Sequence, residues 1–143
     1  MTYGARPSWE IEFTPEAERW FMGLSHEDAN RIAATFDELE RRGPGLGRPF
    51  VDSIKGSRHH HMKEVRSVGG HLRALVAFDP RRQAIVLVGG DKTGNWKGWY
   101  ARNIARADAL YDRHLRDLGE GGRWGTAASS TRRAGTRSEA SGR

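Results

Sequence analysis

The first part of the chain shows two kinds of hydrophobic pattern in succession. Residues 9–13 alternate apolar and acidic side chains, which is the two-residue period of a half-buried strand. Thr14 and Pro15 then supply the N-cap and first residue of a helix, and Ser25 begins a second helix that Gly43 ends. Apolar residues recur at helical spacing, at Ala17, Trp20, Phe21 and Leu24 and then at Ala29, Ile32, Ala33, Phe36 and Leu39. The pattern predicts one strand followed by two antiparallel helices.

The middle of the chain alternates apolar stretches with turn residues. Residues 43–61 are rich in Gly and Pro and are typical of a loop. Three predicted strands follow, over Met62–Val68, Leu72–Phe78 and Ala84–Val88. Gly69-Gly70 suits a two-residue hairpin turn, and Asp79–Arg82 suits a type I turn. These segments predict a three-stranded antiparallel meander.

The last regular element is a helix. Gly89-Gly90 opens a polar loop, after which apolar residues recur at helical spacing as far as Leu118. Residues 119–143 hold Gly, Ser, Thr and Arg with almost nothing to bury. We therefore expect an α+β domain over residues 1–118, with a small mixed sheet, and a disordered basic tail over 119–143.

Composition narrows the kind of protein. The chain of 143 residues has no cysteine, which excludes disulfides and thiolate metal sites. No apolar run approaches the ~18 residues of a membrane span, so we expect a soluble, cytoplasmic protein with no membrane partner. The net charge of +6 is uneven: residues 8–42 carry nine acidic and four basic residues, whereas residues 55–73 carry five basic residues and one acidic residue. This polarity suits a polyanion on one side, and the alternative interpretation is a charge pattern that favours solubility.

Basic residues are concentrated around the predicted hairpin. Arg66 and Arg73 are near cross-strand neighbours on either side of its turn, where like charges repel. An anion between them would relieve the repulsion, and the guanidinium fork matches a phosphate. The alternative is that these arginines pair with Glu64 and Asp79 on a solvated face of the sheet.

The residue types needed to cut RNA without a metal lie in the same half of the chain. When a 2′-hydroxyl attacks the neighbouring phosphorus, a protein must take its proton, neutralise the developing charge and protonate the leaving 5′-oxygen. Arg and Lys can neutralise charge, Glu or His can act as the base, and Tyr, His or Lys can act as the acid, while aromatic rings stack on bases. The run His59-His60-His61 favours phosphate binding over a metal site, because adjacent side chains diverge and no carboxylate is spaced to complete the coordination sphere.

Five short motifs follow one another in the second half of the chain. They are Ile54-Lys-Gly-Ser-Arg58, Met62-Lys-Glu-Val-Arg66, Ala77-Phe-Asp-Pro-Arg-Arg82, Gly89-Gly-Asp-Lys92 and Trp99-Tyr100. With the order of strand, helical hairpin, basic loop, meander and final helix, they resemble the RelE/ParE toxin superfamily and, within it, the phage-derived HigB-like branch. The resemblance covers about residues 9–118 and implies a RelE-like fold.

The resemblance also implies roles for individual residues. The expected catalytic residues are Arg66, Arg73, Lys92, Tyr100 and Glu64. The two arginines would hold the phosphate, Lys92 or Tyr100 would serve the leaving group, and Glu64 or a histidine of 59–61 would be the base. HigB-like proteins often have a histidine near the closing segment, where this chain has tryptophans and a tyrosine, so the acid and the base stay open. The residues expected to bind substrate are Lys55, Arg58, His59, His61 and Lys63, with no metal and no cofactor.

The function that the resemblance implies is that of the toxin in a type II toxin–antitoxin pair. Its expected activity is metal-independent cleavage of messenger RNA, usually on the translating ribosome, by attack of the 2′-hydroxyl. The expected partners are mRNA, the ribosome and a helix-turn-helix antitoxin, with homo- or hetero-oligomers possible. Two alternatives stay open: a gyrase poison that shares the fold but cuts nothing, and an inactive phage-derived module that binds RNA or a partner. The basic stretch 55–73, together with Tyr100, argues against the gyrase poison, because a protein that binds gyrase has no need to hold phosphate.

Overall fold

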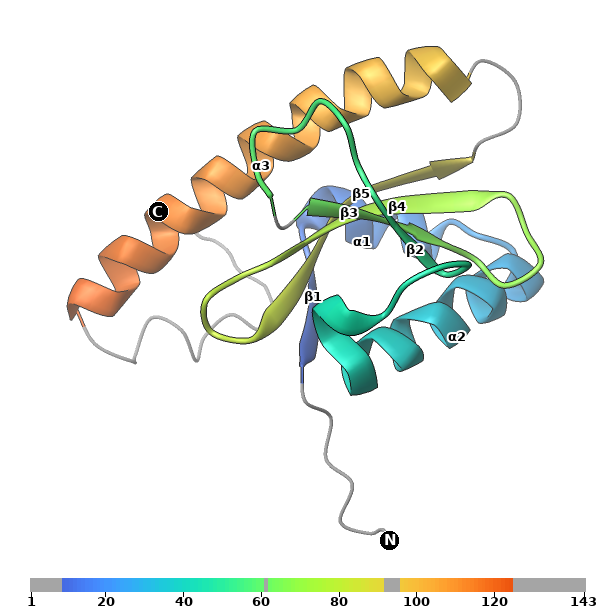
Figure 1. The fold of residues 1–143 in the computed structure, drawn as a ribbon, viewed down its shortest axis with the longest axis horizontal. Coiled ribbons are helices and arrows are strands. Elements are labelled where there is room, and N and C mark those ends of the chain that lie inside the picture. The colour runs from blue at the N-terminus through green and yellow to red at the C-terminus, as the bar shows by residue number, and fades with distance from the viewer. Residues whose placement is uncertain (1–8, 61, 92–95, 125–143) are drawn as a thin grey trace, which may run out of the picture. The chain divides into compact units, whose positions relative to one another are not determined.

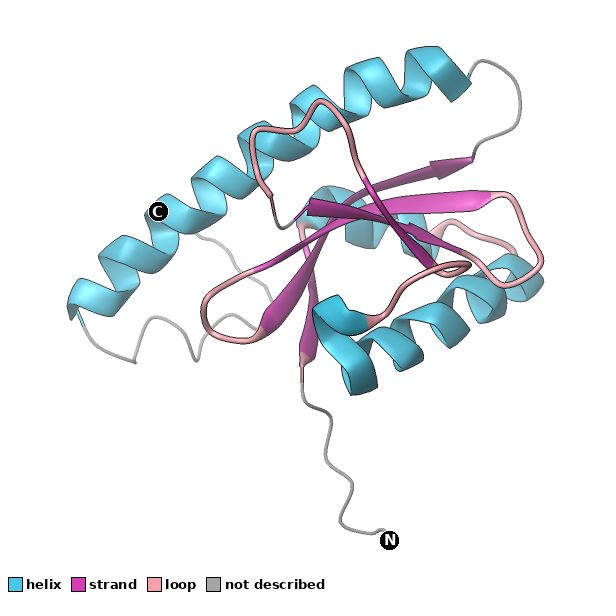
Figure 2. Cartoon of the chain, viewed as in Figure 1, coloured by secondary structure: helices cyan, strands magenta, loops and turns pink. Residues whose placement is uncertain are grey.

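The computed structural model describes residues 9–60, 62–91 and 96–124. Its elements are β1 (Glu10–Phe13), α1 (Pro15–Met22), α2 (His26–Arg42), a 3₁₀ turn η1 (Gly43–Gly45), β2 (Val51–Ser53), β3 (Met62–Arg66), β4 (Leu72–Phe78), β5 (Gln83–Asp91) and α3 (Trp96–Trp124). The strands form one sheet in the order β1-β5-β4-β3-β2, with β1 parallel to β5 and the other neighbours antiparallel (Figure 1, Figure 2). The expected α+β class, with a meander inside a mixed sheet, is confirmed.

The chain divides into two compact units, Met1–Asp108 and Ala109–Arg143. The sheet, α1, α2 and the first part of α3 belong to the first unit. In the second unit α3 continues, and the rings of Tyr111 and His114 stack with their centroids 6.0 Å apart. Among the described residues, no helix is both long enough and apolar enough to span a bilayer.

Side-chain caps begin α1 and α2, as the sequence predicts. The Thr14 hydroxyl oxygen accepts a hydrogen bond from the Ala17 amide at 3.0 Å, and that of Ser25 accepts one from the Asp28 amide at 3.1 Å. The Thr14 hydroxyl also donates to the Leu87 carbonyl at 2.7 Å, which joins the start of α1 to β5. Each cap satisfies a backbone amide that the helix itself leaves without a partner.

The helices α1 and α2 cover one face of the sheet (Figure 1). Ile32 and Leu39 of α2 are fully buried against alternate residues of the central strands. The strand residues of this core are Val51, Val65, Leu72, Ala74, Val76, Phe78, Ala84 and Val86. Removing this apolar surface from water is the main stabilising contribution to the fold.

The opposite face of the sheet carries the first part of α3. A side chain at Gly90 of β5 would overlap the indole of Trp99, so this glycine allows the helix to approach the strand. Successive strand residues alternate between the two faces, and the buried apolar residues on this second face include Met62, Leu75, Ala77 and Ile85. The polar residues that share this face are those of the candidate site.

Two strands differ from the prediction. Val51–Ser53 lies in the predicted loop but forms the edge strand β2, which is too short to show a two-residue period. Strand β5 continues through Gly89 and Gly90, which were expected to open a loop. The rings of Trp20 and Trp99 fill the space that side chains would occupy at these two positions. The glycines therefore provide close packing instead of ending the strand.

The hairpin between β3 and β4 has the predicted register but a different turn. The Ser67 amide donates to the Leu72 carbonyl at 3.2 Å and closes a loop over residues 68–71. In this loop Gly69 has a φ of 65°, in the left-handed region, and Gly70 does not. The hairpin is therefore longer than the two-residue turn that the Gly-Gly pair suggested.

Helix α3 extends beyond the predicted end of the domain. It continues to Trp124, whereas the apolar periodicity ends at Leu118. The first part of the expected tail, residues 119–124, is therefore helical. Residues 125–143 lie outside the described part of the chain.

Candidate functional site

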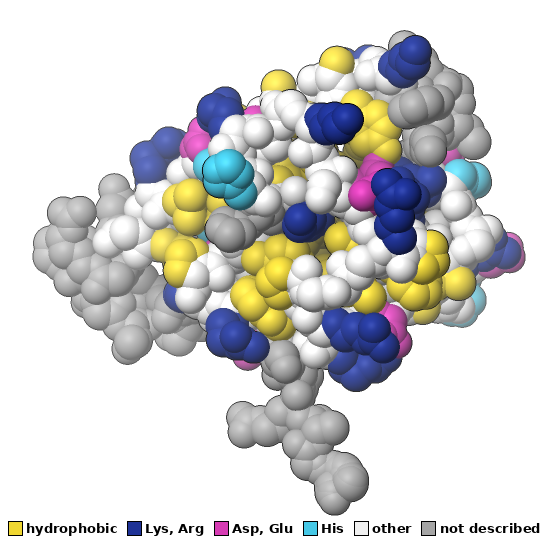
Figure 3. Space-filling model, viewed as in Figure 1, with side chains coloured by type: hydrophobic (Ala, Val, Ile, Leu, Met, Phe, Trp, Pro, Cys, Tyr) yellow, Lys and Arg dark blue, Asp and Glu magenta, His cyan; other side chains and the backbone are white. Residues whose placement is uncertain are grey.

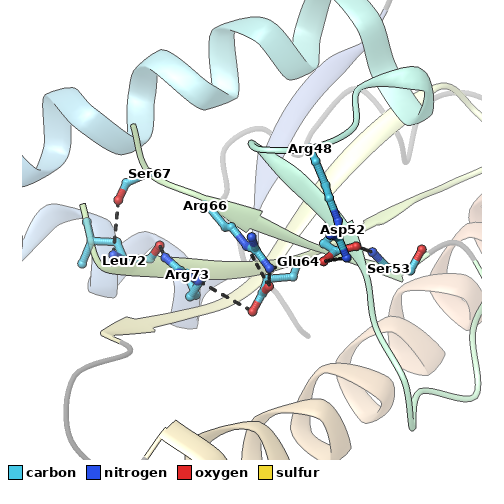
Figure 4. Close-up of polar contacts among 8 residues, drawn as sticks. All are labelled: Arg48, Asp52, Ser53, Glu64, Arg66, Ser67, Leu72 and Arg73. Carbon is cyan, nitrogen blue, oxygen red and sulfur yellow. Dashed lines mark hydrogen bonds and ion pairs between the residues drawn. The ribbon is translucent and has the colours of Figure 1, made fainter. Parts of the chain in front are cut away.

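Arg66 and Arg73 form a cross-strand pair. Arg66 of β3 is in register with Arg73 of β4, and Arg73 is in register with Gly90 of β5. Residues paired across two strands project from the same face of the sheet, and so do residues two apart on one strand. Glu64 is two residues before Arg66 on β3 and therefore lies on the same face as the two arginines. Asp52 of β2 pairs with Glu64 and also faces this side. Figure 4 shows these side chains gathered beside one another.

Arg66 lies between two carboxylates. Its Nε donates to Glu64 Oε1 at 3.1 Å, and its Nη2 lies 3.1 Å from the same oxygen and 3.2 Å from Asp52 Oδ2. Arg48 binds the same oxygen of Asp52, with Nη2 3.0 Å from Oδ2 (Figure 4). The Ser53 amide, which donates to Asp52, is the main cause of a lowered Asp52 pKa, and the guanidinium groups of Arg48 and Arg66 add to it.

The side chain of Arg73 is more deeply buried than that of Arg66. Its side chain is 11% exposed, against 31% for Arg66, and its Nη1 donates to the Leu72 carbonyl at 2.9 Å. Its Nε lies 3.8 Å from Glu64 Oε2, and among the residues that the structure describes neither of these buried atoms has a hydrogen-bond partner. Burial lowers the pKa of Arg73 and nearby Arg66 lowers it further, while Glu64 opposes the change. Of the two guanidinium groups, that of Arg66 is the more open to an anion from solvent.

Helix α2 fixes the end of β3 that carries this pair. The hydroxyl of buried Thr35 donates to the Arg66 carbonyl at 2.7 Å. The Arg66 amide donates to the Phe50 carbonyl at 2.8 Å, and Arg31 Nη1 donates to the Gly69 carbonyl in the hairpin loop at 2.8 Å. The backbone around Arg66 is thus bonded to the β2 side and to α2, which restricts where its guanidinium can lie.

The alternative that Arg66 and Arg73 pair with Glu64 and Asp79 is confirmed for Glu64 and wrong for Asp79. Both arginines lie against Glu64, but Asp79 takes no part. Asp79 accepts hydrogen bonds from the Arg81 and Gln83 amides at 2.9 and 3.0 Å. It therefore stabilises the β4–β5 turn, at the opposite end of the strand from Arg73.

Aromatic residues of α3 lie on the same face as Arg73. The indole of Trp99 packs against Gly90, the cross-strand partner of Arg73, and the Tyr100 ring meets Trp99 edge to face with centroids 5.2 Å apart. Asn103 Nδ2 donates to the Trp99 carbonyl at 2.9 Å. Tyr100 is thus brought to the side of the sheet that carries the arginines, while Trp99 packs against the strand.

The loop before β3 carries several of the expected substrate-binding residues. Lys55 is exposed and makes no hydrogen bond or ion pair within the described residues. Arg58 is 61% exposed at its side chain, and its Nη1 is 3.9 Å from Asp108 Oδ2 on α3. The backbone of His59 bonds to Ser57. This loop presents cations to solvent next to the first strand of the site.

One expected residue, Lys63, faces away from this group. Lys63 alternates with Glu64 along β3 and therefore faces the other side of the sheet, where its Nζ is 3.5 Å from Ser53 Oγ. The sequence predicts that Lys63 binds substrate beside Arg66, and the strand geometry argues against this placement. Lys92 and His61 lie outside the described residues. Within the described residues, no group of three His, Asp or Glu side chains could hold a metal ion.

Two acidic residues of the site were missed from the sequence. Asp52 lies in a strand too short to recognise, so no pattern indicated it. Asp108 is 3% exposed and occupies the buried stripe of α3 beside Ala107. A carboxylate in the apolar stripe of a helix was a signal that could have identified it, because burying an unpaired charge is costly.

The family comparison covers most of the domain. Residues 19–112 match the family described as phage-derived protein Gp49-like (DUF891). The chain is 48% identical over 108 residues to a Mycobacterium tuberculosis protein described as toxin HigB3, covering 76% of this chain and 95% of that protein. It is 44% identical over 111 residues to one described as toxin HigB2 in the same organism, covering 73% of this chain and 55% of that longer protein.

Solved structures show a similar fold. A mutant form of the E. coli toxin RelE in the free state has a TM-score of 0.53 and 10% identity, covering 71% of this chain and 95% of that one. A crystal structure of the isolated E. coli RelE toxin has a TM-score of 0.50 and 10% identity, covering 67% and 98%. At this level of identity the likeness concerns the fold alone.

Proposed function

The chain belongs to the phage-derived Gp49-like family and is a HigB-like toxin of the RelE superfamily, and we propose that it is a metal-independent endoribonuclease that cleaves messenger RNA. Family membership supports its assignment to a toxin–antitoxin system. The cleavage itself is argued from the arrangement of side chains around Arg66 and Arg73.

The observation that carries the proposal is the paired arginines with an incomplete set of counter-ions. Arg48, Arg66 and Arg73 bring three positive charges to Asp52 and Glu64, which bring two negative ones. The group therefore keeps a formal positive charge on a sheet face where the Arg66 side chain, 31% exposed, is open to solvent. A phosphodiester carries one negative charge, which matches the missing negative charge, and its two non-bridging oxygens match the donors of a guanidinium fork.

In the proposed reaction, the 2′-oxygen of one nucleotide attacks the adjacent phosphorus. The bond between O2′ and phosphorus forms while the bond to the 5′-oxygen breaks, which leaves a 2′,3′-cyclic phosphate and a 5′-hydroxyl. A base takes the proton of the 2′-hydroxyl, and an acid gives a proton to the leaving 5′-oxygen. Arg66 and Arg73 donate to the non-bridging oxygens, where negative charge increases in the transition state. No step needs a metal or an external cofactor.

For the general acid and the general base, the proposal names several candidate residues. Tyr100, on the arginine-bearing side of the sheet, and Lys92, in the segment after β5, are the candidates that serve the leaving group. Glu64 and the histidines of the 59–61 run are the candidate bases. Glu64 lies within contact distance of both guanidinium groups. Its other role in the proposal is to separate and orient the guanidinium groups of Arg66 and Arg73.

Further cations would bind the flanking RNA backbone. Lys55 and Arg58 project from the exposed loop before β3, and the face seen in Figure 3 carries more Lys and Arg than acidic side chains. Phosphate contacts of this kind give affinity without sequence preference and weaken as salt rises. The ribosome is the proposed place of action, because mRNA is presented there as a single strand.

Induced expression in bacterial cells tests the proposal. We expect translation to stop within minutes and transcripts to be cut inside reading frames, with new 5′-hydroxyl ends. DNA damage without cut transcripts would instead indicate a gyrase poison that shares the fold. Growth and RNA that both stay normal would indicate an inactive binding module. Either of these results would overturn the nuclease proposal.

The antitoxin is the second proposed partner. We expect a neighbouring gene to encode a small helix-turn-helix protein that copurifies with this chain and restores growth when the two are coexpressed. A neighbourhood without such a gene, or a coexpressed candidate that neither binds nor protects, would contradict this part of the proposal.

A further inference from the structure

Asp108 is a buried carboxylate that joins helix α3 to the loop before β3. Its side chain is 4% exposed. Oδ1 accepts a hydrogen bond from the Ser57 hydroxyl at 2.6 Å, and Oδ2 accepts one from the Arg58 amide at 3.1 Å. Both carboxylate oxygens are therefore engaged by two successive residues of the loop, and Figure 1 shows that loop rising from β2 to meet α3.

Ser57 connects Asp108 to the following residues of the loop through hydrogen bonds. Its hydroxyl group donates to Asp108 Oδ1, and its hydroxyl oxygen accepts from the His59 amide at 3.0 Å. The His59 carbonyl in turn accepts from the amide of Met62, the first residue of β3, at 3.2 Å. The loop is thus a continuous series of hydrogen bonds from α3 to the start of the strand that carries Glu64 and Arg66.

A carboxylate is costly at this position unless it has a specific task. An apolar side chain would suit the buried stripe of α3 better, because a buried charge must be compensated by hydrogen bonds. The compensation here comes almost entirely from the loop that carries Lys55 and Arg58. Hydrogen bonds to a charged acceptor are also stronger and more directional than neutral ones, which suits a group that fixes a loop.

We propose that Asp108 is a positioning residue for RNA cleavage: through Ser57 and the Arg58 amide it fixes the loop of residues 55–60, so that the loop cations meet the RNA backbone in one arrangement. This inference rests on the proposed nuclease function. It adds a residue that touches no substrate and acts through the loop that does.

The first test uses the protein without RNA. Trypsin cuts after Lys55 and Arg58 only when this loop opens, so the rate of these two cuts in the native protein, followed by mass spectrometry, reports how firmly it is held. We expect Asp108→Asn and Ser57→Ala to raise the rate about tenfold, as loss of one hydrogen bond to a charged group would. Ser57→Thr, which keeps the hydroxyl, stays within about twofold of the wild type.

Glu16→Gln is the matched control for the anchoring of α3. Glu16 pairs with Arg106, another α3 residue, at 2.8 Å and does not touch the loop. We expect this variant to leave cutting after Lys55 and Arg58 unchanged. Equal cutting rates in wild type, Asp108→Asn and Ser57→Ala would overturn the inference, since the loop would then be held by something else.

The second test separates positioning from general stability. Cleavage is measured at a temperature where circular dichroism shows every variant folded, and binding is measured with an RNA whose 2′-hydroxyls are replaced by hydrogen. We expect Ser57→Ala to raise KM and the Kd for this RNA about tenfold, to keep kcat within about twofold, and Ser57→Thr to restore both. Faster trypsin cutting with unchanged KM and Kd would overturn the inference, whereas a wild-type protein that neither binds nor cuts RNA would overturn the proposed function.

Discussion

Arg66 and Arg73 stand directly opposite each other on β3 and β4, and the carboxylate of Glu64 lies against both guanidinium groups. Two like charges in neighbouring cross-strand positions repel each other. Glu64 offsets this repulsion only in part, because its single carboxylate faces two guanidinium groups and its Oε2 stays 3.8 Å from Arg73 Nε. The pair is therefore arranged for one more anion, and the proposed occupant is the scissile phosphate.

Replacing Glu64 by glutamine should strengthen RNA binding while slowing cleavage. Glu64→Gln removes the negative charge that competes with phosphate for Arg66 and Arg73 but keeps the shape of the side chain. We expect the Kd for a non-cleavable RNA to fall about tenfold at low salt and kcat to fall at least tenfold, through loss of the base or of guanidinium orientation. Fluorescence anisotropy and single-turnover cleavage measure the two effects. Unchanged RNA affinity would mean that Glu64 does not compete with phosphate.

A methyl group at Gly90 should disturb the contact between β5 and α3. The Cβ of Gly90→Ala would overlap the Trp99 indole, and the helix or the ring would have to shift. We expect the free energy of unfolding to fall by about 1–3 kcal/mol, the usual cost of overpacking. Gly47→Ala is the control, since a Cβ there has no neighbour within 4 Å. Urea titration of both variants checks the prediction. An equal loss of unfolding free energy in the two variants would contradict the packing of Trp99 against Gly90.

Asp52 should make stability depend on pH in the acid range. Its pKa is lowered in the folded protein, so its carboxylate stabilises the fold above the ordinary value near 3.8 and loses that contribution as the pH falls through the lowered value. Asp52→Asn should therefore be less stable than wild type at pH 7, with the difference disappearing under strongly acid conditions. Thermal unfolding from pH 2 to pH 7 measures this.

Glu40 provides a control of opposite sign for the pH experiment. Burial, followed by the nearby carboxylate of Asp37, raises the pKa of Glu40. Its protonated form is favoured by folding, so its contribution is present at low pH and lost as the pH rises through the raised value. Glu40→Gln should gain stability relative to wild type at pH 7 and lose that gain in acid. The same sign for both variants would show that the two local environments are not as described.

The pairing of Arg66 with Arg73 could be predicted from the sequence, because both residues lie equally far from the Gly69-Gly70 turn. The position of a turn limits the registers that a hairpin can adopt. Arg66 meets Arg73 even though the turn is longer than expected, since the loop over residues 68–71 preserves the same register. The order of elements was predictable for a similar reason. Long apolar stretches and capping residues determine helices and strands with little help from distant parts of the chain.

The rest of the site depends on contacts between segments far apart in the sequence. Asp52 reaches Arg66 through a three-residue edge strand that has no pattern of its own, and Asp108 meets Ser57 across 51 residues. Lys63 illustrates a different limit: its charge suggested RNA binding, but alternation along β3 turns it away from Arg66. Charge composition shows which residues are available, and only the strand register shows which of them share a face.

The cleavage rate of the Arg73→Ala variant tests the central claim most directly. The substrate is mRNA on translating ribosomes, and the new 5′ ends are counted at a temperature where circular dichroism shows each protein folded. We expect a loss of about 10²–10³ in rate, the usual effect of removing one donor to a developing charge, with Arg73→Lys intermediate because it keeps the charge without the fork. Arg19→Ala, an exposed arginine of α1, should keep the wild-type rate. A folded Arg73→Ala protein that cuts mRNA as fast as wild type would contradict the account.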